Sequence, residues 1–310
     1  MINTYEKIGF EPITLEKKEI YDRALSADSG ERGCEFSFAN LYLWGRQYMA
    51  TIGETVMLFS QFDRRSVYPY PVGSGDKRAA LDSIISDARS RGIPCRITGL
   101  SESDRETVEA LYPEMFRYHN DEGSYDYVYD INDLADLKGK KYDGKRNHIN
   151  RFAAEHPDFT VEPISDENLD KTRAMVAEWY RSRLEENPDA DFHMERAAIE
   201  RALRDREALG MDGIVLLCDG EVIAMTLGNR MREDTYDVNF EKARADIQGA
   251  YPTVNREFAR YLREKYPTLR YIDREEDMGS EGLRRAKKSY HPHHMIKKYW
   301  ACLLEDGYDY

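Results

Sequence analysis

Acidic residues alternate along one stretch of the chain in a pattern that could support proton transfer. Within TYDVNFEKA, residues 235–243, every second position is occupied by Asp237, Asn239 or Glu241. Side chains two residues apart in a strand share one face of the sheet, so these three should lie together. A carboxylate in that position can accept a proton from an amine nucleophile, which makes Asp237 and Glu241 candidate general bases. The alternative is a polar strand edge that faces solvent.

A second acidic group lies in YIDREEDMGSEGLRRAKKSYHPHHMIKKY, residues 271–299. The pattern predicts a strand that ends in charged residues, a glycine turn, a short basic helix and a final strand. Glu276 and Asp277 are candidate catalytic groups because neighbouring carboxylates raise each other's proton affinity. They could instead pair with Arg274, Arg284 or Lys287 and only hold the end of the sheet to the helix.

The predicted helix in this stretch also carries candidate residues. Leu283, Lys287 and Tyr290 are spaced i, i+4 and i+7, so they should share an inward-facing side. Tyr290 is a candidate general acid, or else a tyrosine packed beneath the helix. Lys287 and Arg284 are candidate contacts for the phosphates of a donor.

Positive charge is concentrated in two places although the chain as a whole carries −13. Residues 138–151 sum to +5 and residues 284–298 to +6. In KGKKYDGKRNHINRF, residues 138–152, cations alternate with amides, a mixture that suits phosphate oxygens. A charge run can equally be the solvated face of a helix. The candidate donor-binding residues here are Lys141, Lys145, Arg146, Asn147 and Asn150.

A helix is expected to start near residue 250, after the loop RADIQGAYPT. Its unpaired backbone amides would suit a pyrophosphate or a carboxylate. The loop holds one glycine and lacks the Gly-rich run of a tight diphosphate cradle. The candidate residues at this position are Gln248, Gly249, Tyr251 and Asn255.

The remaining composition limits the class of protein. Four widely spaced cysteines with no CxxC pair indicate neither a disulfide framework nor a zinc site. No metal is expected at His291, His293 and His294, because Pro292 forces an extended chain and no acidic ligand is suitably spaced. The N-terminus does not resemble a signal peptide, and no run of eighteen apolar residues occurs. A cytoplasmic protein without a transmembrane segment is expected.

The order of predicted elements is similar in the two halves of the chain. Each half contains helices, a hairpin, a further helix and a further strand, and the second hairpin turns at Asp219-Gly220. We therefore expect an N-terminal domain over residues 1–137, a basic bridge over 138–160, and a C-terminal domain over 161–310 that holds the site.

Residues 138–152 and 271–292 together resemble the cytosolic C-terminal domain of bacterial phosphatidylglycerol lysyltransferases. The resemblance extends over about residues 30–300 and implies an α+β fold of two tandem Gcn5-related N-acetyltransferase-like domains, as in the Fem-type aminoacyltransferases. Each domain would have a mixed, mostly antiparallel sheet flanked by helices. The matching positions are Lys141, Lys145, Arg146, Asn147, Asn150, Glu276, Asp277, Gly279, Leu283, Arg284, Lys287, Ser289 and Tyr290.

Relatives of this kind transfer an aminoacyl group from charged tRNA to a lipid or peptide acceptor. The resemblance thus implies an acyltransferase that uses aminoacyl-tRNA or acyl-CoA as co-substrate, with no covalently bound cofactor, and an amine or hydroxyl acceptor on a small molecule, lipid or peptide. Transfer RNA would bind through the basic stretches. The loop before the helix near 253–265 lacks the Q/RxxGxG/A motif of acetyl-CoA users. The alternative is a non-catalytic binding protein that holds a small anionic ligand or a partner.

Overall fold

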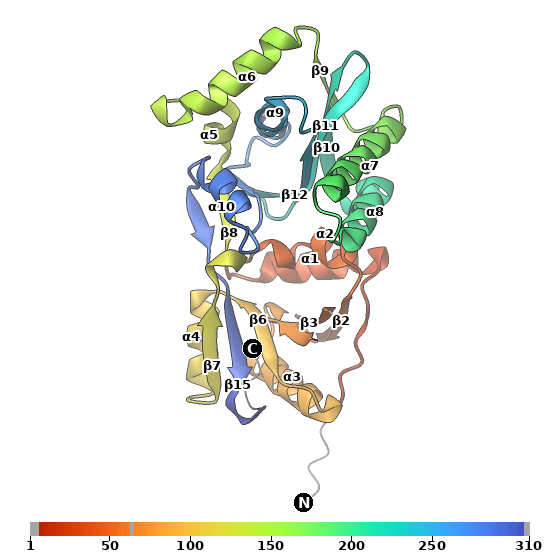
Figure 1. Ribbon diagram of the computed structural model, residues 1–310. Coiled ribbons are helices and arrows are strands. Elements are labelled where there is room, and N and C mark those ends of the chain that lie inside the picture. The colour runs from red at the N-terminus through yellow and green to blue at the C-terminus, as the bar shows by residue number, and fades with distance from the viewer. Residues whose placement is uncertain (1–5, 63–64, 307–310) are drawn as a thin grey trace, which may run out of the picture. The chain divides into compact units, whose positions relative to one another are not determined.

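The computed structural model describes residues 6–62 and 65–306, and the chain forms two compact units (Figure 1). The first unit runs through Asp126 and adds Glu276–Ser280 and the segment from Met295 onward. The second unit consists of Tyr127–Glu275 and Glu281–His294.

The first unit is built on a sheet that, within the described residues, has eight strands in the order β1-β2-β3-β4-β6-β15-β7, with β5 paired to β3. The strands are β1 Glu11–Pro12, β2 Gln47–Ile52, β3 Thr55–Phe62, β4 Arg65–Pro69, β5 Val72–Gly73, β6 Arg96–Leu100, β7 Phe116–Asn120 and β15 Tyr299–Leu303. The helices are α1 Lys18–Ala27, α2 Phe38–Leu43, α3 Lys77–Arg91 and α4 Glu102–Leu111.

Local sequence explains where these elements begin and end. The predicted hairpin between β2 and β3 is confirmed, and its turn contains Gly53 with φ 55°. Helix α4 begins after Ser101. The reason is a capping box in which Ser101 and Asp104 each accept a hydrogen bond from the other's backbone N–H.

The second unit has a sheet of seven strands, again counting the described residues, in the order β14-β8-β13-β12-β11-β10-β9. The strands are β8 Asp126–Asp130, β9 Thr160–Pro163, β10 Met211–Cys218, β11 Glu221–Arg230, β12 Thr235–Ala243, β13 Tyr271–Asp273 and β14 His294–Ile296. The helices are α5 Ile131–Asp136, α6 Asp143–Glu155, α7 Leu169–Glu186, α8 His193–Leu209, α9 Ala250–Lys265 and α10 Glu281–Lys288.

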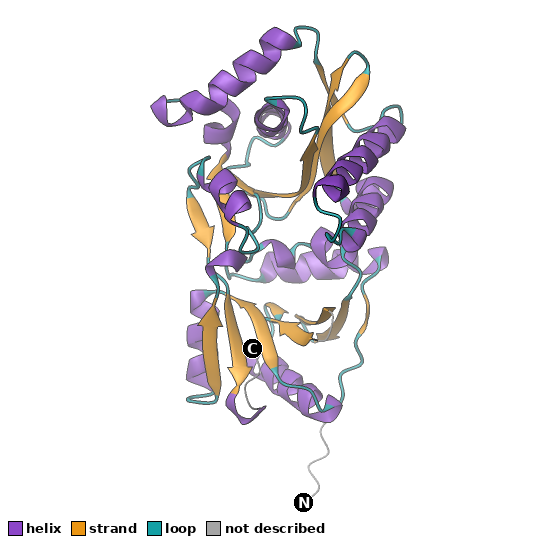
Figure 2. Ribbon diagram, viewed as in Figure 1, coloured by secondary structure: helices purple, strands orange, loops and turns teal. Residues whose placement is uncertain are grey.

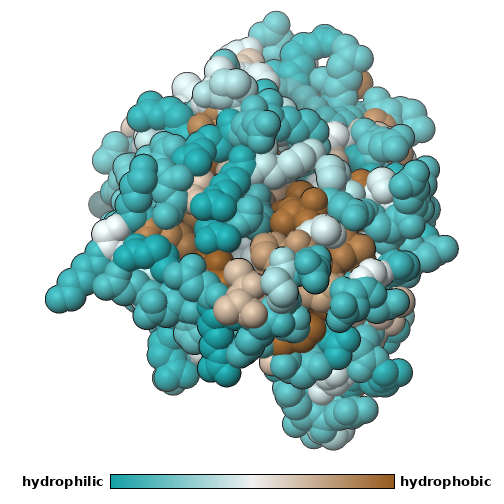
Figure 3. All heavy atoms as spheres, turned by 90° about the horizontal axis from the view of Figure 1, so that it is seen from above, coloured by the Kyte–Doolittle hydropathy of each residue, from teal (hydrophilic) through white to brown (hydrophobic). Residues whose placement is uncertain are grey.

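Strands β10 and β11 lie between β9 and β12 in this sheet, and their side chains are buried almost throughout. The predicted turn at Asp219-Gly220 joins them, with φ values of 51° and 78°. Helix α9 lies on one side of these strands, and α7 and α8 lie on the other (Figure 2). Hydrophilic side chains cover most of the face seen from above, and the largest group of hydrophobic ones lies near its middle (Figure 3).

Both units contain the same arrangement of strand, crossover helix and parallel strand. It is β4–α3–β6 in the first unit, where Tyr68 pairs with Ile97, and β12–α9–β13 in the second, where Tyr236 pairs with Ile272. The pairs β1–β2, β2–β3, β3–β4, β3–β5, β6–β15 and β7–β15 of the first sheet are antiparallel. The pairs β8–β13, β9–β10, β10–β11 and β11–β12 of the second sheet are antiparallel as well. The predicted α+β class with two similar halves is confirmed.

The units divide differently from the expected ranges 1–137, 138–160 and 161–310. Strand β8 joins the second sheet beside β13, and the last strand, β15, joins the first sheet between β6 and β7. The basic bridge belongs to the second unit, where residues 143–155 form α6. Domain boundaries drawn in sequence order could not predict that β8 and β15 join sheets with distant parts of the chain, because strand partners far apart in sequence leave no local signal.

No helix in the described part of the chain is both long enough and apolar enough to span a bilayer.

Candidate active site in the second unit

Strands β12 and β13 pair over only three residues and then part. Thr235, Tyr236 and Asp237 pair with Tyr271, Ile272 and Asp273. β12 continues to Ala243 while still paired with β11 on its other side, whereas β13 ends at Asp273. Side chains therefore fill the space between the end of β13 and the second half of β12. This space lies at the carboxyl ends of two parallel strands, which is where open α/β sheets bind ligands.

Three side chains from three elements meet at this point. Arg274, directly after β13, donates from Nη2 to Glu241 Oε1 on β12 at 2.9 Å. Asn255 on α9 donates from Nδ2 to Glu241 Oε2 at 3.1 Å. The side chains of Glu241 and Arg274 are 12% and 14% exposed, so the ion pair is largely removed from water. Glu241 is thus an ordered carboxylate with both oxygens engaged.

Two polar atoms of this group keep unused hydrogen-bonding capacity. Arg274 Nη1 and Asn255 Oδ1 are buried and have no hydrogen-bond partner within the described residues. Buried polar atoms are rarely left in this state, because each one costs about 1–3 kcal/mol when unsatisfied. A ligand that brings an oxygen to the guanidinium and an N–H to the amide would satisfy both.

Lys145 on α6 faces the same group. Lys145, Ile149 and Phe152 are spaced i, i+4 and i+7, and the latter two are fully buried, so Lys145 lies on the inner stripe of its helix. Its Nζ lies 3.9 Å from the centre of the Tyr290 ring. Burial and the nearby Arg274 charge lower the pKa of Lys145 to about 8, while Glu241 opposes the shift.

Tyr290 follows α10 and is buried, as its predicted inward face requires. Its ring lies 5.0 Å from the Arg274 guanidinium carbon, and its carbonyl accepts a hydrogen bond from the Tyr142 hydroxyl at 3.0 Å. Burial raises the pKa of Tyr290 well above its ordinary value, and Arg274 only partly offsets this. The phenol therefore stays protonated near neutral pH and is a weak acid.

Asp237 lies deeper than a reacting group usually does. It is fully buried, accepts a hydrogen bond from Asn239 Nδ2 at 3.0 Å, and lies in register between Asn229 and Asp273 on the neighbouring strands. The alternative of a solvent-facing strand edge is therefore wrong, because Asn239 is also buried.

The predicted donor-binding turn before α9 is packed against other helices. Gly249 has φ 89°, and a Cβ added there would lie 2.5 Å from the His148 carbonyl oxygen of α6. The Tyr251 hydroxyl accepts a hydrogen bond from Trp179 Nε1 of α7 at 2.9 Å, and Gln248 is exposed. The glycine here allows close helix packing rather than an open phosphate cradle.

The predicted cations mostly have partners inside the protein. Lys141 pairs with Asp133 at 3.1 Å, and Arg146 contacts Asp143 and the carbonyls of Leu137 and Gly139. Asn147 and Asn150 are exposed on α6, and Arg284 is half-buried on α10. Lys287 is buried, and its ammonium donates to the carbonyl oxygens of Arg274 and Glu275, which holds the loop after β13 in place.

Glu276 and Asp277 belong to the first unit, not to the group around Glu241. Asp277 is buried and its Oδ1 accepts from the Gly279 N–H at 2.9 Å, which shapes the turn. Glu276 lies 3.5 Å from the ammonium of Lys298, which also contacts Asp126 and Glu35, each at 2.7 Å.

This Lys298 cluster is a tightly packed set of charges. Burial raises the pKa of Glu276 to about 7, Lys298 lowers it, and Asp126 and Glu35 add to the rise. The ligand atoms of Cys34, Glu35 and Asp126 lie within 4.8 Å of one another, which could suit a metal ion. The ammonium of Lys298 lies among these groups and already supplies the positive charge they require.

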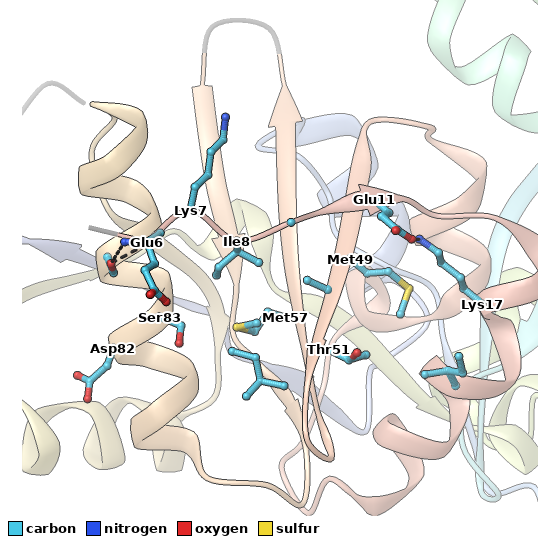
Figure 4. Close-up of a pocket in the computed structure, with 15 residues that line it drawn as sticks. Glu6, Lys7, Ile8, Glu11, Lys17, Met49, Thr51, Met57, Asp82 and Ser83 are labelled. Carbon is cyan, nitrogen blue, oxygen red and sulfur yellow. Dashed lines mark hydrogen bonds and ion pairs between the residues drawn. The ribbon is translucent and has the colours of Figure 1, made fainter. Parts of the chain in front are cut away.

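A shallow hollow of about 760 Å³ lies elsewhere in the first unit, between the N-terminal segment and β2 (Figure 4). Its lining includes Met49 and Met57, and its charged residues Glu11 and Lys17 pair with each other at 2.9 Å. Within the described residues, no side chain that lines this hollow has a buried polar atom without a hydrogen-bond partner, whereas Arg274 and Asn255 each have one. We therefore place the candidate chemistry in the second unit.

Sequence reasoning named Glu241, Asn255, Lys145 and Tyr290 but assigned them to separate motifs. It treated Arg274 only as a possible partner for Glu276 and Asp277, and it did not single out Lys298. One signal could have identified Arg274 as a site residue. It is the first residue after a strand parallel to β12, and residues at the carboxyl ends of parallel strands meet at one edge of the sheet.

Comparison with known proteins agrees with this fold. A conserved protein of unknown function from Bacteroides thetaiotaomicron VPI-5482 is 37% identical, with a TM-score of 0.89 over 96% of this chain and 99% of that one. L-PGS from Bacillus licheniformis is 18% identical, with a TM-score of 0.69 over 96% and 94%. A tandem GNAT protein from the clavulanic acid biosynthesis pathway is 11% identical, with a TM-score of 0.51 over 98% and 100%.

An uncharacterized protein of Mycoplasmoides gallisepticum, MYCGA3080, is 23% identical over 193 residues, and the match covers 59% of this chain and 58% of that protein. The model of the family described as phosphatidylglycerol lysyltransferase, C-terminal, matches residues 26–302. The suspected resemblance is thereby confirmed, and the chain belongs to the family of phosphatidylglycerol lysyltransferase C-terminal domains.

Proposed function

We propose that this chain is an acyltransferase that moves an aminoacyl or acyl group from an activated donor to an amine or hydroxyl acceptor in the second unit. The observation that carries the proposal is the buried group of Glu241, Arg274 and Asn255, which keeps one guanidinium N–H and one amide oxygen for a ligand.

The chemistry of acyl transfer fits these two atoms. The acceptor attacks the acyl carbon, and the carbonyl oxygen gains negative charge before the bond to the leaving group breaks. A fixed cationic donor in a site with little water stabilises that charge, so Arg274 Nη1 suits the carbonyl oxygen. Asn255 Oδ1 is an acceptor and suits an N–H of the substrate, such as the amino group of an aminoacyl donor.

We favour an aminoacyl donor over acyl-CoA. The family takes its description from a lysyltransferase, and the free amino group of an aminoacyl ester would match Asn255. The turn before α9, where a diphosphate would be expected, is packed against α6 and offers no open glycine cradle. Transfer RNA would contact the exposed cations of α10, among them Arg285 and Lys288. The acceptor would be a lipid, a peptide or a small amine.

The proposal is tested by turnover of the full chain against labelled aminoacyl-tRNAs, including lysyl-tRNA, and a panel of acyl-CoAs. The acceptors are phosphatidylglycerol vesicles, short peptides and simple amines. We expect product with at least one aminoacyl donor, and a loss of about 100-fold or more in Arg274→Gln. Arg89→Gln is the matched control, because Arg89 lies on the surface of the first unit and pairs with Glu305.

One result would overturn the enzyme proposal. If no donor turns over while an aminoacyl or other anionic compound still binds to the wild type and not to Arg274→Gln, the chain is a binding protein with an acyltransferase fold.

A further inference from the structure

Within the described residues, Lys145 is a partly buried cation of the basic bridge that forms no ion pair with a carboxylate, whereas Lys140, which forms none either, is exposed. Each of four neighbours pairs with a carboxylate of the second unit, namely Lys138 with Asp136, Lys141 with Asp133, Arg146 with Asp143, and Arg151 with Glu155. For Lys145 the contact found within the described residues is the face of the Tyr290 ring. Its position is therefore not explained by local charge pairing.

Three side chains from three parts of the second unit surround the Lys145 amine. Arg274 follows β13, Glu241 lies on β12, and Tyr290 follows α10. Glu241 already accepts hydrogen bonds from Arg274 and from Asn255, and within the described residues it forms no hydrogen bond or ion pair with Lys145. On α6 itself, the nearby Asp143 pairs with Arg146. A half-buried amine next to a guanidinium is the arrangement that favours the uncharged form.

We propose that the uncharged amine of Lys145, rather than the Glu241 carboxylate, takes the proton from the attacking acceptor, a role that rests on the proposed transfer function. The N–H or O–H bond of the acceptor breaks as the acceptor atom bonds to the acyl carbon, and Lys145 becomes an ammonium. Lys145 then returns the proton to the leaving oxygen or sulfur of the donor as the acyl bond breaks. No oxidant or further reactant is needed.

Two observations favour Lys145 over the residues first expected to act as bases. Both oxygens of Glu241 accept hydrogen bonds from cationic or amide donors, and Asp237 has no exposed surface. Lys145 has a pKa of about 8, so about half of the amines are uncharged at pH 8 and available as bases. In the wild type, a phosphate contact would gain nothing from a lowered pKa, since it needs the charged form.

The experiment compares wild type, Lys145→Arg, Lys145→Ala and the control Lys140→Arg, which changes an exposed lysine in the turn just before α6. Turnover and donor KM are measured from pH 6 to 10, and the lysines of isotope-labelled full-length protein are titrated by NMR. Arginine keeps a positive charge but cannot lose its proton in this range.

We expect kcat of the wild type to rise with a midpoint near pH 8, together with one lysine signal that titrates there and is absent in Lys145→Arg. In Lys145→Arg, kcat should fall by about 100-fold or more while the donor KM changes by less than about threefold. Methylamine should restore part of the activity of Lys145→Ala, and Lys140→Arg should match wild type.

The role is overturned if Lys145→Arg keeps its kcat and loses only donor affinity, or if Lys145 titrates above pH 10 in an active wild type. In both cases acyl transfer itself would stand. Absence of turnover by wild type with every donor would instead overturn the transfer function, and the role of Lys145 with it.

Discussion

At the scale of single residues, the ion pair between Arg274 and Glu241 is largely buried, so each charge depends on the other for compensation. Removing one partner leaves the other charge buried and uncompensated, which typically costs about 3–5 kcal/mol, whereas removing both costs much less. We expect Glu241→Gln and Arg274→Met each to destabilise the protein by about 3 kcal/mol. The double variant should be clearly more stable than the sum of the two losses predicts, as measured by urea unfolding. Additive losses would mean that the two charges do not interact.

Glu276 gives the protein a distinctive dependence of stability on pH. Its pKa is raised from 4.5 to about 7, so the folded state holds the proton more tightly than the unfolded state. The contribution is fully present below pH 4.5 and is lost as pH rises through 7. Glu276→Gln imitates the protonated form at every pH.

We therefore expect Glu276→Gln to match wild type in thermal stability at about pH 4.5 and to become progressively more stable than wild type up to about pH 8. Thermal unfolding of both proteins at a series of pH values measures this difference. A difference that does not change with pH would show that Glu276 ionises normally in the folded protein.

At the scale of elements, the contact between α6 and the start of α9 keeps Lys145 beside the site. Gly249 permits this contact, because a Cβ there would lie 2.5 Å from the His148 oxygen and 2.8 Å from Phe152 Cβ, with φ at 89°. We expect Gly249→Ala to destabilise the protein by about 2 kcal/mol or more and to reduce turnover, since α6 must shift.

Gly144 on α6 provides the matched control for this glycine. A Cβ added there meets nothing within 4 Å and the residue is helical, so Gly144→Ala should be neutral or stabilise by up to about 1 kcal/mol. Urea unfolding of both variants makes the comparison. Equal effects would mean that Gly249 does not set the distance between the two helices.

The same elements show how far the sequence could predict the site. Strand β12 and the hairpin before it were predictable, because alternation and a turn dipeptide are local signals. The spacing of Lys145, Ile149 and Phe152 also predicts that they share one face of α6. The surrounding charges, however, are equally typical of a helix that faces solvent. The meeting of Arg274, Glu241 and Asn255 was not predictable, since it depends on how far β12 and β13 stay paired.

At the scale of the whole molecule, the chain exchanges strands between its two sheets. Strand β15 lies between β6 and β7 in the first sheet although it comes from the end of the sequence, and β8 lies beside β13 in the second. Lys298, just before β15, also supplies the positive charge for the buried Asp126 and the neighbouring Glu35. The first unit is therefore incomplete without the last segment of the chain.

This dependence predicts that residues 1–126 alone do not fold. Without β15 the strands β6 and β7 lose their shared partner, and without Lys298 two carboxylates lose their cation. Residues 1–126 joined through a flexible Gly/Ser linker to residues 295–310 should recover the native sheet, and Lys298→Met in that linked chain should prevent the recovery. Circular dichroism and hydrogen exchange of the three chains test this. If residues 1–126 alone show cooperative unfolding and protected amides in β6 and β7, the first sheet forms independently of β15. In that case the N-terminal part of the chain folds as a continuous domain, as its order in the sequence predicted.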